Sequence, residues 1–254
     1  MLCRKHYSEI PNITTGRNTN GFMKPRLLLL ICLTALIYLG SAFQPALLDD
    51  ADAANAATAR EMVERHDWVT MHMNGVRFLE KAPLMYWAIA ASFKAFGVST
   101  FNARLPLALA TILLVIVVYA FGKWMGGERA GFYAGLSLSV GMGTYLFTRI
   151  LIFEVILTLW ITLALFIFLK VYYEEWKPHW IYAFYACLAG AVLSKALIGV
   201  LFPLGILFFF VLLTNGWKHV WRLKPISGAL PARMAMIAMT TRSSMRVKAE
   251  RFME

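Results

Sequence analysis

The feature that most constrains this chain is a series of long apolar blocks. A helix needs about 20 consecutive apolar residues to cross the roughly 30 Å hydrocarbon core of a bilayer. Uncharged blocks of suitable length occupy 27–48, 105–122, 130–148 and 196–216. Two further blocks are less clean, because 150–169 contains Glu154 and 178–194 is short. The pattern predicts an all-α polytopic membrane helix bundle with about six transmembrane helices.

Composition also favours lipid rather than water as the solvent of this bundle. Of the 254 residues, 59% are hydrophobic and 15% are charged, whereas roughly a quarter of a soluble domain is charged. The formal net charge is +11, and in a membrane protein basic residues flank the spans and orient them. The chain has no basic segment studded with aromatic residues, which argues against nucleic acid as a partner.

The distribution of Lys and Arg predicts the orientation of the bundle. Block 83–97 carries Lys94 and is short, so it fits an interfacial amphipathic helix better than a seventh span. With six spans and a cytoplasmic N-terminus, most of the 25 basic residues fall on the cytoplasmic side, as the positive-inside rule requires. Segment 49–104 is then a large outer loop, and Glu154 and Lys195 face the same, periplasmic side of the inner membrane.

The two ends of the chain are more polar than its middle. Residues 1–26 are basic and predict a cytoplasmic segment in front of an uncleaved signal-anchor helix. The tail, 225–254, contains no apolar span. We expect this tail to be disordered and atypical, as in a truncated or frameshifted product.

The outer loop contains the most distinctive polar residues. Good helix formers at 53–65 predict an amphipathic helix over the membrane surface, and Asn74-Gly75 predicts a turn. Carboxylates next to a span are often merely solvated. Glu154 is different, because an acid at the centre of a bilayer costs about 2.5–3.5 kcal/mol. It indicates either a functional residue or the partner of a base such as Arg149.

Several motifs of this loop carry a family resemblance. They are Asp49-Asp50, Arg60-Glu61-Met62, Asp67-Trp68, Asn74-Gly75, Arg77, Glu80-Lys81, Pro83 and Tyr86-Trp87, followed by FNARLP at 101–106 and by the turn SKALIG. As a set they resemble the polyprenyl-phosphate-sugar-dependent glycosyltransferases of the GT-C class. That family includes the lipid A aminoarabinose transferases and the dolichyl-phosphate-mannose protein mannosyltransferases. The resemblance covers residues 27 to about 220, within a transmembrane domain expected at 27–224.

The resemblance implies a catalytic base just after the first span. The family has an acidic pair there, and its leading acid serves as base on the acceptor. Asp50 is the first choice for this role in the present chain. Asp49 and Asp52 stay open as alternatives, because the spacing to the motif at 60–62 differs from the usual one.

The resemblance also implies the residues that meet the donor. Lys81 corresponds to a lysine that contacts the lipid phosphate, and Glu80 to an acid that shapes the site, in some members through a divalent metal. Glu154 corresponds to a catalytic acid of the second outer loop, and Lys195 to a lysine of the third outer turn. Arg77 and Arg104 are further candidates for binding phosphate.

These assignments predict a reaction. A sugar would move from a polyprenyl-phosphate donor to a lipid A, glycan or protein acceptor by direct, inverting displacement, with cations stabilising the departing phosphate. Members of the family are longer, so the chain corresponds to an N-terminal half. Two alternatives stay open: a small transporter or flippase that uses Glu154, Arg149 and Lys195 as intramembrane charges, and an inactive truncated membrane protein.

Overall fold

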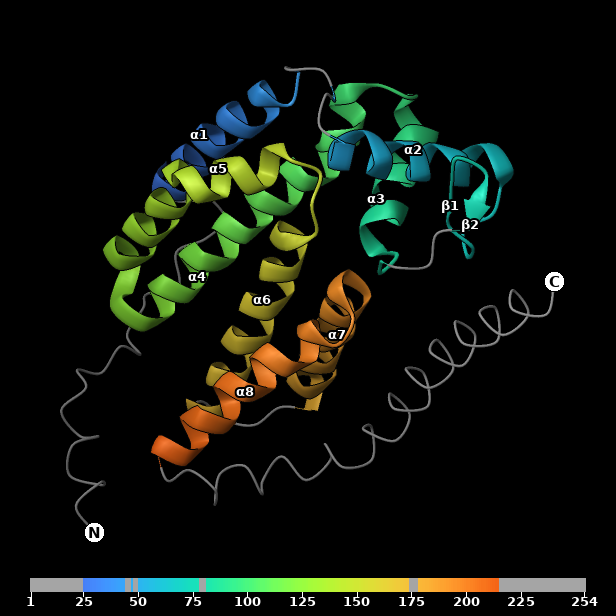
Figure 1. The fold of residues 1–254 in the computed structure, drawn as a ribbon. Helices are drawn as coiled ribbons and strands as arrows, with labels where there is room; N and C mark the ends of the chain where they lie inside the picture. The colour runs from blue at the N-terminus through green and yellow to red at the C-terminus, as the bar shows by residue number, and fades with distance from the viewer. Residues whose placement is uncertain (1–24, 44–46, 48–49, 78–80, 174–177, 215–254) are drawn as a thin grey trace, which may run out of the picture.

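The computed structural model describes residues 25–43, 47, 50–77, 81–173 and 178–214, and these residues fold into a helical bundle (Figure 1). The helices are α1 (Pro25–Ser41), α2 (Asp50–Arg65), α3 (Leu84–Phe96), α4 (Thr100–Val140), α5 (Met142–Arg149), α6 (Glu154–Tyr173), α7 (Pro178–Lys195) and α8 (Ile198–Leu213), and one short hairpin joins β1 (His72–Met73) to β2 (Val76–Arg77). The predicted all-α bundle is confirmed. Residues 1–24 and the predicted tail at 225–254 lie outside the described residues.

The helices form two neighbouring groups. α1, α4, α5, α6, α7 and α8 make the larger bundle, in which α1 packs on α4 and α7 packs on α6 and α8. α2, α3 and the hairpin gather at one end of it (Figure 1). α3 joins the groups, because it contacts both α2 and α4.

Helix α4 is two antiparallel helices joined at Gly127. This glycine has φ 83° and ψ −178°, which is not a helical conformation, and the positive φ favours glycine. The two arms pack with their backbones in contact, since a Cβ atom on Gly131 would lie 2.5 Å from the carbonyl oxygen of Tyr119. The reversal falls between the predicted spans 105–122 and 130–148.

The structure corrects the predicted helix boundaries after this reversal. A single helix over 130–148 is wrong, because Gly141 is extended and divides the region between α4 and α5. Two glycines within three residues, at 141 and 143, weaken a helix through their conformational entropy. The next helix starts at Glu154 rather than at 150, because side chains of α2 hold the backbone of the preceding residues, as described below.

By length and composition, two helices of the described residues can cross a bilayer, namely α4 and α6. α1, α3 and α8 are apolar as well but shorter. The six spans and the side on which the N-terminus lies stay predictions. α3 is 13 residues long and buries a helical stripe that includes Met85, Ile89 and Phe93 against α2 and α4, which fits its predicted place outside the spans.

Candidate active site

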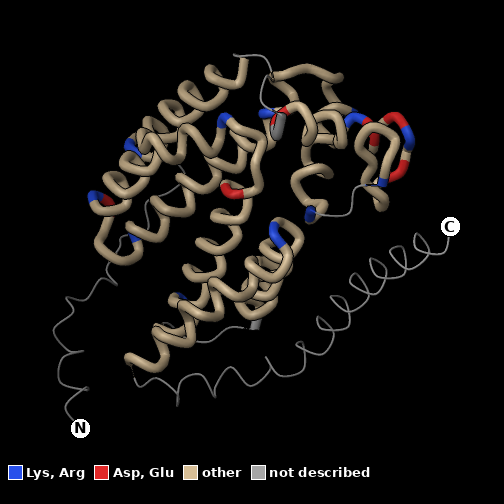
Figure 2. Tube along the Cα trace, in the orientation of Figure 1, with Lys and Arg blue, Asp and Glu red and all other residues tan. Residues whose placement is uncertain are grey.

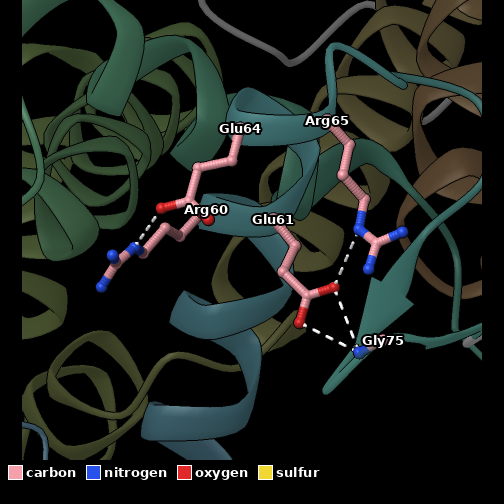
Figure 3. Close-up of polar contacts among 5 residues, drawn as sticks. All are labelled: Arg60, Glu61, Glu64, Arg65 and Gly75. Carbon is pink, nitrogen blue, oxygen red and sulfur yellow. Dashed lines mark hydrogen bonds and ion pairs between the residues drawn. The ribbon is translucent and has the colours of Figure 1, made fainter.

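Helix α2 separates two kinds of side chain. Its buried face carries small or apolar residues together with Asp52 and Asn55. Its exposed face carries two ion pairs at i, i+4 spacing, in which Arg60 Nε lies 2.6 Å from Glu64 Oε1 and Arg65 Nε lies 3.4 Å from Glu61 Oε2 (Figure 3). Such alternation is what an amphipathic helix requires. The predicted helix at 53–65 is therefore confirmed, with its start at Asp50.

The hairpin that follows is tied to this helix. His72 pairs with Arg77 and Met73 with Val76, which leaves Asn74 and Gly75 as the turn, with φ values of 54° and 79°. Two positive φ values are typical of a type I′ turn, so the predicted turn is confirmed. The backbone N–H of Gly75 donates to Glu61 Oε1 at 3.3 Å (Figure 3).

The motif Asp67-Trp68 also builds the loop. Asp67 Oδ1 accepts hydrogen bonds from the backbone N–H groups of Thr70 at 2.9 Å and Val69 at 3.0 Å. These bonds lower the pKa of the Asp67 carboxyl. The carbonyl of Trp68 accepts a hydrogen bond from the Trp87 indole at 2.7 Å. Asp67 and Trp68 thus support the shape of the loop.

Two candidate site residues form a buried ion pair. Arg104 Nη2 lies 3.3 Å from Asp52 Oδ2, and the two side chains are only 4% and 6% exposed. Asp52 Oδ1 also accepts a hydrogen bond from the N–H of Leu151 at 2.7 Å, and Arg104 Nε donates to the carbonyl of Arg149 at 3.1 Å. Asp52, an alternative for the base, and Arg104, a candidate for phosphate binding, are therefore engaged with the protein itself.

Glu154 and Lys195 form a second, more accessible pair. Lys195 Nζ donates to Glu154 Oε1 at 2.5 Å, and the side chains are 39% and 36% exposed. Arg149, suggested above as the partner of Glu154, instead donates to the hydroxyl of Tyr145, so that suggestion is wrong. Glu154 Oε2 is buried and has no hydrogen-bond partner within the described part of the chain.

Lys81 joins this pair from a third segment. Its ammonium lies 5.6 Å from the centroid of the Phe153 ring, and Phe153 immediately precedes Glu154. Near the start of α6, Lys195 thus contacts Glu154 and Lys81 contacts the residue before it. Such a group of positive charges suits an anionic ligand.

The remaining predicted site residues lie away from the start of α6 or have side chains outside the described part of the chain. Arg77 is exposed at the end of β2. Asp50 is the first residue of α2, but its side chain, Asp49 and Glu80 lie outside the described residues. Among the described residues, no three His, Cys, Asp or Glu side chains group closely enough to hold a metal ion. Metal binding through Glu80 therefore stays a prediction.

Figure 2 shows where the charged residues lie along the chain trace. They concentrate in α2 and the hairpin, while the larger bundle is uncharged over most of its length. Lys195 and Glu154 are among the few charges of that bundle, and they occupy the ends of α7 and α6. The charged group therefore sits where the apolar bundle meets the polar loop.

Sequence reasoning missed Asn55, whose side chain bonds Leu151 and Tyr86. The helical spacing of the sequence does indicate that Asn55 is buried. Asn55 falls three residues after Asp52 and shares its helix face with Ala59 and Met62, which is the apolar face of α2. A polar residue on such a face needs a buried partner.

Comparison with known proteins identifies the family. A family model described as dolichyl-phosphate-mannose-protein mannosyltransferase matches residues 27–243. The chain belongs to this family. An undecaprenyl phosphate-alpha-4-amino-4-deoxy-L-arabinose arabinosyl transferase 2 from Sodalis glossinidius is 25% identical over 207 residues, which are 78% of this chain and 37% of the relative. A transferase of the same description from Aeromonas salmonicida, without the numeral, is 36% identical over 137 residues, 51% of this chain and 24% of the relative.

Solved structures agree with this mannosyltransferase-family fold. ArnT from Cupriavidus metallidurans in the apo state has a TM-score of 0.76 at 23% identity, covering 89% of this chain and 42% of ArnT. The same protein bound to undecaprenyl phosphate has a TM-score of 0.72 at 24% identity, covering 77% of this chain and 37% of ArnT. The chain spans less than half the length of these relatives.

Proposed function

We propose that this chain carries the donor-binding face of a membrane glycosyltransferase, which moves a sugar from a polyprenyl-phosphate carrier to an acceptor. The observation that carries the proposal is that two lysines from separate segments contact neighbouring residues at the start of α6, Lys81 at Phe153 and Lys195 at Glu154. Negative charge accumulates on the leaving phosphate as the sugar departs, and fixed cations stabilise that charge. Family membership supports the class of reaction, and the ArnT structure named above contains undecaprenyl phosphate.

In this proposal the two lysines bind the phosphate, and Glu154 holds Lys195 in position. The ion pair fixes the Lys195 ammonium at the end of α7. The side chain therefore loses less conformational entropy when the ligand binds. Lys81 stands over the ring of Phe153, which restricts it in a similar way through a cation–π contact.

The base is assigned to Asp50, with Asp49 as the alternative. It would take a proton from the acceptor hydroxyl or amine while the acceptor atom attacks the anomeric carbon. The bond from that carbon to the phosphate oxygen breaks, and polyprenyl phosphate leaves with the electron pair. One displacement inverts the anomeric centre and forms no covalent enzyme intermediate. Lipid A, another glycan or a protein is the proposed acceptor, on the periplasmic side of the inner membrane.

Binding of undecaprenyl phosphate to the full chain in nanodiscs tests the donor site. Lys81→Met should weaken binding about tenfold or more, because a hydrogen bond between charged groups contributes about 1.5–3 kcal/mol. Lys94→Met is the matched control, since Lys94 also lies over an aromatic ring, that of Trp68 at 5.8 Å, but belongs to no part of the site. Equal loss in both variants, or in neither, would refute the donor site.

Sugar transfer from a radiolabelled polyprenyl-phosphate donor tests the base. Asp50→Asn should abolish transfer while leaving binding of undecaprenyl phosphate unchanged, because the amide is isosteric but takes up no proton. Full transfer by this variant would remove Asp50 from the mechanism and direct the same test to Asp49.

A further inference from the structure

The turn between α5 and α6 is held by side chains of another helix. The N–H of Leu151 donates to Asp52 Oδ1 at 2.7 Å, and the carbonyl of Leu151 accepts from Asn55 Nδ2 at 2.7 Å. Asp52 and Asn55 are three positions apart and therefore lie on one face of α2. Both polar groups of a fully buried residue are thus satisfied from a single helix face.

The remaining atoms of the two side chains are also fixed. The Tyr86 hydroxyl donates to Asn55 Oδ1 at 2.8 Å, which leaves the amide nitrogen directed at Leu151. Burial raises the pKa of the Tyr86 hydroxyl, so it stays protonated and able to donate. Asp52 Oδ2 is paired with Arg104. We call Asp52, Asn55 and Tyr86, with the backbone of Leu151, the Leu151 clamp.

The clamp lies directly before the charged group of the site. Glu154 begins α6 three positions after Leu151, and Phe153 between them packs its ring at 68° to the ring of Tyr86, with centroids 5.6 Å apart. The Phe153 ring also contacts the Lys81 ammonium. A shift of the turn would therefore move Glu154 relative to Lys195.

We propose that Asp52 and Asn55 are positioning residues, which hold the start of α6 so that the Glu154 carboxylate meets Lys195. The carboxylate and amide act through the backbone of Leu151 and need no contact with donor or acceptor. The relevance of these two residues to catalysis rests on the proposed function. Their effect on the contact between Glu154 and Lys195 exists in the chain without ligand.

Acylation of Lys195 by an N-hydroxysuccinimide ester, followed by mass spectrometry of the full chain, measures the positioning directly. The pair with Glu154 shields the amine, and Glu154→Gln gives the rate for an unpaired Lys195. Asn55→Ala should raise the Lys195 rate about fivefold, the effect expected for loss of one hydrogen bond, toward the Glu154→Gln rate. Lys94 in the same sample is the internal reference and should not change.

Two variants separate positioning from general damage to α2. Thr58→Val removes a buried hydroxyl from the same helix, one that donates to the carbonyl of Ala54, and should leave the Lys195 rate at its native value. Tyr86→Phe keeps the ring and removes only the hydrogen bond that orients Asn55. It should therefore raise the Lys195 acylation rate less than Asn55→Ala does. Native Lys195 rates in both Asn55→Ala and Tyr86→Phe would overturn the clamp, as would an equal rise in Thr58→Val.

Binding of undecaprenyl phosphate to the same samples separates this inference from the proposed function. If the native chain does not bind, the proposed function fails, and the acylation rates still decide whether the clamp positions Glu154. If the native chain binds, Asn55→Ala should weaken binding about fivefold, in line with the acylation result. Raised acylation with native affinity would overturn the contribution of the clamp to the donor site.

Discussion

Glu154 and Lys195 are 41 positions apart in the sequence, and their side chains meet at 2.5 Å. One is the first residue of α6 and the other the last residue of α7. An acid at a helix N-terminus and a base at a helix C-terminus are each favourable to their own helix dipole. Each charge of the pair is therefore favourable at its own helix end, and the contact holds the start of α6 against the end of α7.

The Glu154–Lys195 pair should contribute little to folding stability, although Lys195 should contribute strongly to ligand binding. Both side chains are more than a third exposed, so a double-mutant cycle with Glu154→Gln and Lys195→Met should give a coupling below about 1 kcal/mol. Thermal unfolding in detergent measures it. Lys195→Met should nevertheless weaken binding of undecaprenyl phosphate about tenfold or more. A coupling well above that limit would mark the pair as structural.

Arg104→Met should be strongly destabilising. The pair with Asp52 is buried, and removal of one partner leaves an uncompensated charge, which costs about 3–5 kcal/mol. Arg60→Met is the matched control, because its pair with Glu64 is exposed, and it should change stability by less than about 0.5 kcal/mol.

Adding Asp52→Asn to Arg104→Met should recover part of that loss, because the amide carries no charge and keeps an oxygen for the Leu151 N–H. Denaturant unfolding of the four proteins in one detergent gives the comparison. Similar losses for Arg104→Met and Arg60→Met would contradict the buried pair.

The turn at Asp67 should respond to acid. Its hydrogen bonds to Thr70 and Val69 lower the carboxyl pKa in the folded chain. The carboxylate therefore stabilises the turn fully above its unfolded pKa of about 3.9, and this contribution is lost as the pH falls through the lower, folded value. Hydrogen exchange at the amides of Val69 and Thr70 should show the loss. Asp67→Asn should remove the pH dependence, and a midpoint above pH 4 would contradict the assignment.

Gly75→Ala should loosen the hairpin. Gly75 has a φ of 79°, and a side chain in the left-handed region costs about 1–2 kcal/mol. Proteolysis within 71–77 should therefore be faster in this variant. Gly143→Ala is the control, because a Cβ atom there meets nothing within 4 Å. Equal proteolysis in the two variants would show that the turn tolerates a side chain.

Local chemistry made part of the fold predictable. The helix at 53–65 and the turn at Asn74-Gly75 follow from residue preferences within short segments. Lys81, Glu154 and Lys195 were singled out differently, through the family resemblance and through a count of spans that stays a prediction.

Contacts between distant segments were not predictable in the same way. Arg149 was a reasonable partner for Glu154 by sequence distance, but Lys195 is the partner. The late start of α6 depends on Asp52 and Asn55, which lie on a different helix and satisfy Leu151. Spacing along one segment cannot reveal which backbone groups another segment will occupy.

The distance in sequence between Asp52 and Leu151 constrains the order of biosynthesis. The two residues are 99 positions apart, so the ribosome adds Leu151 long after α2 has been made. Until then the acid and the amide of α2 lack this backbone partner. Final docking of α2 therefore has to wait for later helices to be made, and the segment that contains α2 reaches its final structure only after most of this bundle has been translated.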